Sequence, residues 1–133
     1  MYEKLLNVQK ELGAIQKDST NPYFKSKYFD INALLAHVKP VLNKHGLVIV
    51  QALTNVGGKS ALDTKIIDAE SKNAIASEPV ILPECTDAQK FGSAVTYFRR
   101  YAIQTLLALE AEDDDGNVSA NKITKKLDDS VPF

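Results

Sequence analysis

Residues 89–117 read QKFGSAVTYFRRYAIQTLLALEAEDDDGN, and most of this stretch predicts one long amphipathic helix that runs to about Leu109. At about 3.6 residues per turn, a set of apolar side chains shares one side of the helix. We expect that side to pack on the core of the domain, with Thr86 or Asp87 as the N-cap. The apolar stripe consists of Phe91, Val95, Phe98, Ala102, Leu106 and Leu109.

The remaining surface of this helix combines basic and aromatic side chains. Arg100 lies opposite the packing stripe, and Arg99 lies on one flank. The other flank carries Lys90, Tyr97 and Tyr101. Guanidinium and ammonium groups neutralise phosphates, and aromatic rings offer faces on which bases stack. An ordinary solvated helix face beside the edge of a core would show the same spacing. The helix is therefore a candidate nucleic-acid surface.

Composition is that of a globular chain with an uneven distribution of charge. The 133 residues suffice for one core and carry a net charge of −1. Residues 1–109 have a balance of +3, from 13 basic and 10 acidic side chains, whereas residues 110–133 have a balance of −4, from 3 and 7. We expect a mildly basic core domain over residues 1–117 and a flexible acidic tail over residues 118–133.

Two shorter helices are predicted before the first strand. Apolar residues recur at helical spacing between Tyr2 and Lys17. Asp30 is a suitable N-cap for a second helix, which should end at His45-Gly46. Pro40 lies inside this second pattern and should kink the helix or divide it in two.

Three β-prone runs follow the second helix and predict an antiparallel meander. Pro79 and Pro83 suggest that the third strand lies at an edge of the sheet or ends early. The expected fold is α+β: a three-stranded antiparallel meander packed against a long C-terminal helix, with two N-terminal helices. The three runs are Leu47–Leu53, Ser60–Asp68 and Ala74–Leu82.

Two further segments offer basic groups to an anionic partner. The loop at residues 21–29 interleaves Lys25 and Lys27 with four aromatic rings, a pattern that suits backbone tracking and base stacking, although some of those rings would also fit the core. Gly58-Lys59-Ser60 imitates the end of a P-loop, but Leu53 stands where that motif needs a glycine. We therefore expect a hairpin tip, at which Lys59 can contact a phosphate.

No pattern in the chain predicts catalysis, a cofactor or a metal site. His37, His45 and Cys85 are isolated from one another, without ligand spacing or a partner for nucleophilic chemistry. The acidic run at residues 113–115 is out of register for a calcium loop. A metal-dependent nuclease using that run stays a third hypothesis, since consecutive acids in a flexible segment lack rigid support. The single cysteine and the absence of a signal peptide or long apolar run predict a soluble, cytoplasmic protein.

The last six residues combine acidic and apolar groups. Asp128 and Asp129 precede Val131, Pro132 and Phe133, so this tail can dock into a basic-rimmed apolar pocket on a partner. An ordinary solubilising tail is the alternative.

Four blocks of the sequence, in order over residues 2–118, resemble the ERF (essential recombination function) family of phage single-strand annealing proteins. The resemblance implies a three-stranded sheet on a long helix, similar to Rad-type annealing domains, and assembly into rings or filaments. It also implies that paired basic residues on that helix, here Arg99 and Arg100, face a DNA groove. The blocks are residues 21–28, 38–47, 89–101 and 113–117.

The C-terminal tip resembles that of bacterial single-stranded-DNA-binding (SSB) proteins. This second resemblance implies that the tail recruits host replication or repair proteins that read such a tip, in the cytoplasm of a bacterial host, or that it competes for the protein's own DNA groove.

The leading hypothesis is ATP-independent binding and annealing of single-stranded DNA in phage or prophage recombination. Phosphates would be contacted by Arg99, Arg100, Lys90, Lys25 and Lys27, while Tyr97 and Tyr101 would shape or stack in the groove. The alternative is a single-strand-binding protein that protects DNA without annealing it, although an OB barrel needs five strands and only three are predicted.

Overall fold

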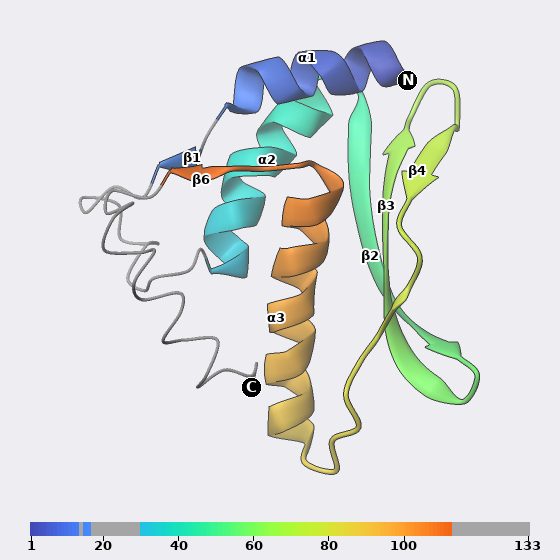
Figure 1. Ribbon diagram of the computed structural model, residues 1–133. Coiled ribbons are helices and arrows are strands. Elements are labelled where there is room, and N and C mark those ends of the chain that lie inside the picture. Colours follow the sequence, from blue (N-terminus) through green and yellow to red (C-terminus); the bar gives the residue numbers. More distant parts are fainter. Residues whose placement is uncertain (14, 17–29, 113–133) are drawn as a thin grey trace.

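The computed structural model describes residues 1–13, 15–16 and 30–112, and it has the expected α+β architecture. Two helices precede the main strands, and the longest helix follows them (Figure 1). The elements in chain order are α1 (Tyr2–Leu12), β1 (Ile15–Gln16), α2 (Ile31–Lys44), β2 (Leu47–Val56), β3 (Lys59–Asp68), β4 (Ala74–Ala76), β5 (Val80–Ile81), α3 (Ala88–Leu106) and β6 (Ala111–Glu112).

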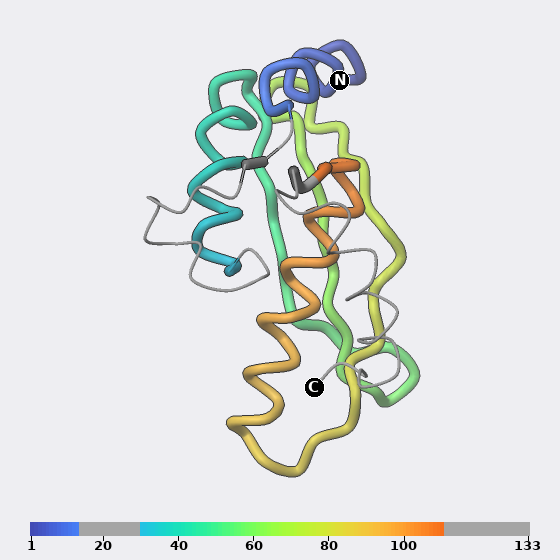
Figure 2. The backbone as a smooth tube through the Cα atoms, turned by 60° about the vertical axis from the view of Figure 1, so that its left-hand side comes forward, coloured from blue at the N-terminus to red at the C-terminus, as the bar shows by residue number. Residues whose placement is uncertain are grey.

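The three helices lie on the same side of an antiparallel sheet (Figure 1). Helix α2 packs on β2 and α3 packs on β3, while α1 crosses α2 at one end of the layer, as the turned view in Figure 2 also shows. Helices α2 and α3 contact each other as well. This two-layer arrangement leaves one long side of α3 turned away from the sheet.

A long hairpin forms the centre of the sheet. Strands β2 and β3 pair over their full length, from Leu47 opposite Asp68 to Val56 opposite Lys59. The two residues between them, Gly57 and Gly58, have φ values of 59° and 82°. A two-residue turn with positive φ at both positions matches the twist of the flanking strands, and glycine adopts it without steric cost. The expected hairpin tip is therefore confirmed, with Lys59 beside the turn.

The third strand lies at the edge of the sheet, as the two prolines indicate, but it is divided. Strands β4 and β5 both pair with β3, and Pro79 lies in the gap between them. Proline has no N–H to donate to a β ladder, so pairing is interrupted there. The predicted single run over Ala74–Leu82 is thus replaced by two short strands.

Two predicted helix ends were wrong, and of the two outcomes predicted for Pro40 the division of the second helix is excluded. Helix α1 ends at Leu12 instead of Lys17, because Gly13 follows it with a φ of 55°. Helix α3 ends at Leu106, three residues earlier than predicted. Helix α2 continues through Pro40, because the carbonyl that loses its donor belongs to Ala36, which is exposed and can bind water. The N-cap of α2 is as expected, with Asp30 accepting from the Ala33 N–H at 2.8 Å.

The core is built from all three helices and the central hairpin. One cluster joins α1, α2, β2, β3 and the end of α3, and a second joins β3 to the middle of α3. In the second cluster Ala102 is buried and three residues of the predicted stripe pack around it: Phe91, Val95 and Phe98. Near its end, however, α3 is anchored by buried Ile103 and Leu107, while Leu106 and Leu109 are only partly buried.

A short parallel pair of strands, β1 and β6, was not predicted from the sequence. Ile15 of β1 lies opposite Ala111 of β6, and Gln16 lies opposite Glu112. The chain that leaves α3 therefore returns to the end of α1. Within the residues that the structure describes, no helix has the length and apolar character needed to cross a bilayer.

Candidate nucleic-acid interface

The outer flank of α3 holds an arginine over two tyrosine rings. Tyr97 and Tyr101 are four residues apart, so they lie one turn from each other on the same flank. Their ring centroids are 4.6 Å apart with the planes tilted by 47°. The Arg100 Cζ atom lies 5.2 Å from the Tyr97 centroid and 5.3 Å from the Tyr101 centroid. Both distances fall within cation–π range, and Arg100 is partly exposed.

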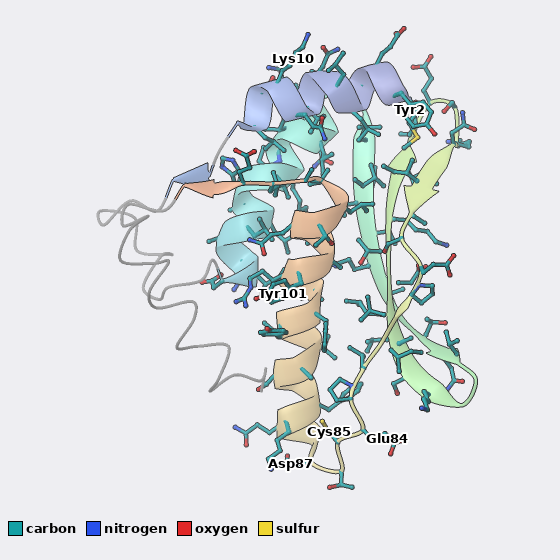
Figure 3. All side chains as sticks on the ribbon, viewed as in Figure 1. Tyr2, Lys10, Glu84, Cys85, Asp87 and Tyr101 are labelled. Carbon is teal, nitrogen blue, oxygen red and sulfur yellow. The ribbon has the colours of Figure 1, made fainter. Side chains whose placement is uncertain are left out.

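An open, mostly apolar groove runs along this flank between α3 and β5. Its volume is about 470 Å³; α3 supplies the aromatic and small side chains of its lining, and β5 supplies Val80. Phe98 meets Tyr97 edge to face, with centroids 5.5 Å apart. Figure 3 shows Tyr101 about midway along α3, well above the loop in which Glu84 and Cys85 lie. The groove is lined by Val80, Tyr97, Phe98, Tyr101, Ala102 and Thr105.

Arg99 lies on the other flank of α3 and is tied to the sheet. Its Nε donates to Gln51 Oε1 at 3.2 Å, and Gln51 Nε2 donates to the Arg99 carbonyl oxygen at 3.1 Å. The same Gln51 amide also donates to the hydroxyl of Thr64, which is fully buried, at 3.0 Å. The structure therefore does not bring Arg99 and Arg100 together. Contact of Arg99 with DNA stays a prediction.

Gln51 and Thr64 were not singled out from the sequence. Both occupy inward-facing positions of β2 and β3, where they are opposite each other in the ladder. Side chains alternate between the two faces of a strand, so a glutamine in register with Leu47 and Ile49 should face the helices. A polar residue at such a position indicates a buried hydrogen-bonding partner.

The other predicted basic contacts differ in how the structure places them. Lys90 is exposed, two turns before Tyr97 on the same flank of α3. Lys59 is exposed beside the β2–β3 turn, and that turn lies at the same end of the molecule as the start of α3 (Figure 1). Lys25 and Lys27 lie outside the described residues. So do the predicted tail contacts at Asp128, Asp129, Val131, Pro132 and Phe133.

Asp68 is a buried charge at the far end of the sheet from the β2–β3 turn. Its side chain is 3% exposed, and Lys4 Nζ lies 2.8 Å from its Oδ1 atom. The Lys4 ammonium holds the pKa of this carboxyl well below its usual range, and the Glu70 backbone N–H adds a hydrogen bond at 3.0 Å. Because this cluster ties α1 to the end of β3, its role is structural.

The described residues contain no group of three or more histidine, cysteine or acidic side chains placed to hold a metal ion. The acidic run at residues 113–115 lies outside them. His45 Nε2 lies 3.4 Å from Glu11 Oε1, and Cys85 is partly exposed in the loop before α3. The arrangement on α3 can thus bind an anion next to aromatic surface.

Comparison with known proteins gave one match, to a protein family. The ERF superfamily matches residues 1–130, nearly the whole chain. Neither the curated proteins nor the solved structures that were compared with the chain gave a match. On the basis of this family match, the chain belongs to the ERF superfamily.

Proposed function

We propose that this protein binds single-stranded DNA and anneals complementary strands during phage or prophage recombination, without ATP. Membership of the ERF superfamily supports a role in recombination and strand annealing. The described part of the structure adds a partly exposed cation beside aromatic surface on α3, which is the chemistry that nonspecific single-strand binding uses.

The observation that carries the proposal is the position of Arg100 over Tyr97 and Tyr101. The guanidinium group neutralises a backbone phosphate, and the adjoining rings provide π surface for bases of any sequence. Lys90 extends the positive charge along the same flank toward the β2–β3 turn and Lys59. A strand held mainly by its phosphates keeps most of its base edges available to a second strand.

An annealing assay tests the proposal against its alternative. Two complementary oligonucleotides are mixed with and without the protein, and duplex formation is followed by the quenching of a paired fluorophore and quencher. An annealing protein accelerates pairing without ATP, whereas a protein that only protects single strands slows it. Binding combined with slower pairing would support the protective alternative, and no binding would contradict both.

The oligomeric and cellular parts of the proposal rest on the family. We propose that copies of the chain assemble into a ring or filament, so that the α3 surfaces form one continuous groove. We also propose that residues 128–133 recruit host proteins that read an acidic, apolar tip. Light scattering with and without single-stranded DNA tests assembly. Pull-down of host proteins by the full chain, compared with a chain lacking residues 128–133, tests recruitment, and equal capture by both would contradict it.

A further inference from the structure

The groove between α3 and β5 is suited to a flat apolar ligand. Its volume of about 470 Å³ falls within the range of small-molecule sites, roughly 300–1,000 Å³. Tyr97, Phe98 and Tyr101 supply aromatic surface on one side, and Val80 supplies an aliphatic contact on the other. Aromatic faces next to an aliphatic wall can hold a planar ring by stacking and dispersion.

The groove is adjacent to a positive charge. Arg100 lies about 5 Å from the centroids of Tyr97 and Tyr101, and these two residues also line the groove. A ligand that joins an anionic group to a flat ring can therefore contact Arg100 and the groove at once. A nucleotide of a single strand is such a ligand, with its phosphate on Arg100 and its base against the rings.

The hydroxyl of Thr105, which lines the groove, is hydrogen-bonded within α3. The Thr105 hydroxyl donates to the Tyr101 carbonyl oxygen at 2.8 Å and lies 3.2 Å from the Ala102 carbonyl oxygen. Its proton is thereby used within the helix, which leaves a lone pair but no free donor. Stacking tolerates every base because each has a π face.

We propose that each protomer inserts one base of the bound strand into this groove while Arg100 holds the phosphate of the same nucleotide. The inference rests on the proposed binding of single-stranded DNA and goes beyond it, because it divides the strand into anchored and free nucleotides. The anchored base fixes the strand on the protein. The neighbouring bases remain outside the groove and sample the complementary strand.

An oligonucleotide without bases tests this division. Binding of the full chain to oligo-dT is compared with binding to an oligonucleotide of equal length made of abasic units, which keeps every phosphate. Stacking contributes about 1–3 kcal/mol per base, so oligo-dT should bind about 5- to 150-fold more tightly. Equal binding of both would overturn the inference and leave the proposed function in place, whereas binding of neither would contradict the proposed function itself.

Variants that fill the groove provide a second test of base insertion. Val80→Met narrows it from β5, and Thr105→Leu narrows it from an exposed position on α3; neither adds a new stacking face, and one variant remains if the other fails to fold. Each should lower affinity for oligo-dT toward the abasic value and leave affinity for the abasic strand and the salt dependence unchanged. Arg100→Ala is the matched control, since it should weaken binding to both strands. Unchanged oligo-dT binding in a folded, groove-filled variant would overturn the inference.

Discussion

Arg99 and Gln51 are joined by two hydrogen bonds in opposite directions. The Arg99 Nε donates to the Gln51 side chain at 3.2 Å, and the Gln51 amide donates to the Arg99 carbonyl oxygen at 3.1 Å. This exchange ties the middle of α3 to the inward face of β2. Arg100, the next residue, is about 100° further round the helix and is partly exposed.

Arg99→Ala should lower the free energy of unfolding by about 1–2 kcal/mol, because it removes one hydrogen bond and leaves the Gln51 carbonyl oxygen without its donor. The bond from Gln51 to the backbone of residue 99 should persist. A double-mutant cycle with Gln51→Ala, measured by urea unfolding, should give a coupling energy of about 0.5–1.5 kcal/mol. Additive effects would show that the two side chains do not stabilise each other.

Arg100→Ala should weaken DNA binding for all sequences alike, and the loss of its contacts with the Tyr97 and Tyr101 rings should lower the free energy of unfolding by about 0.5–1 kcal/mol. For single strands, the slope of log K against log salt becomes shallower by about 0.7 for each phosphate that the protein no longer neutralises. Titration of oligo-dT at several salt concentrations measures this slope. Lys10→Ala is a matched loss of one positive charge on α1, which lies at the top of Figure 3, away from Tyr101, and it should have little effect. An unchanged slope in Arg100→Ala would remove Arg100 from the site.

Tyr101→Leu should weaken binding by about 1–3 kcal/mol through loss of a stacking face, with the salt slope unchanged. Tyr101→Phe retains the ring and is the matched control, so its affinity should stay close to that of the wild type. Tyr101 is 37% exposed, and neither change should unfold the chain. Equal weakening by both changes would indicate that the hydroxyl, and not the ring, makes the contact.

The Lys4–Asp68 pair should make stability depend on pH. The pKa of Asp68 is lowered in the folded state by Lys4, so its contribution is present above the usual aspartate value of about 3.9 and is lost as the pH falls through the folded value. Lys4 has a raised pKa, so its contribution is lost only at the alkaline end. Asp68→Asn should be less stable at pH 7 and show a flatter acid limb in urea unfolding. An unchanged acid limb would assign the pH dependence to other groups.

Features that depend on neighbours along the chain could be predicted from the sequence. Asp30 and Asp87 cap their helices through N–H groups two or three residues away, at 2.8 Å each. Gly57 and Gly58 form the hairpin turn with their own backbone angles. The separation of Arg99 from Tyr97 and Tyr101 onto opposite flanks of α3 also follows from helical geometry alone.

Helix ends and strand limits were predicted less well, because tertiary contacts decide them. Ile15 fits the apolar spacing of α1, yet it pairs with Ala111 in a short parallel ladder. No local sequence pattern predicts this pairing. Leu107 follows the last residue of α3 and is buried where the helical pattern placed Leu106 and Leu109.

The sequence by itself determined the α+β class, the long helix and the kinds of side chain on each flank, because these follow from periodicity and local hydrogen bonding. Only the tertiary structure decided which other elements each flank of α3 contacts. The register of β2 places Gln51 under Arg99, and the pairing of β5 with β3 places Val80 beside the tyrosines of α3. Such contacts between residues distant in sequence arise from the packing of whole elements. The spacing of residues along the chain therefore cannot predict them.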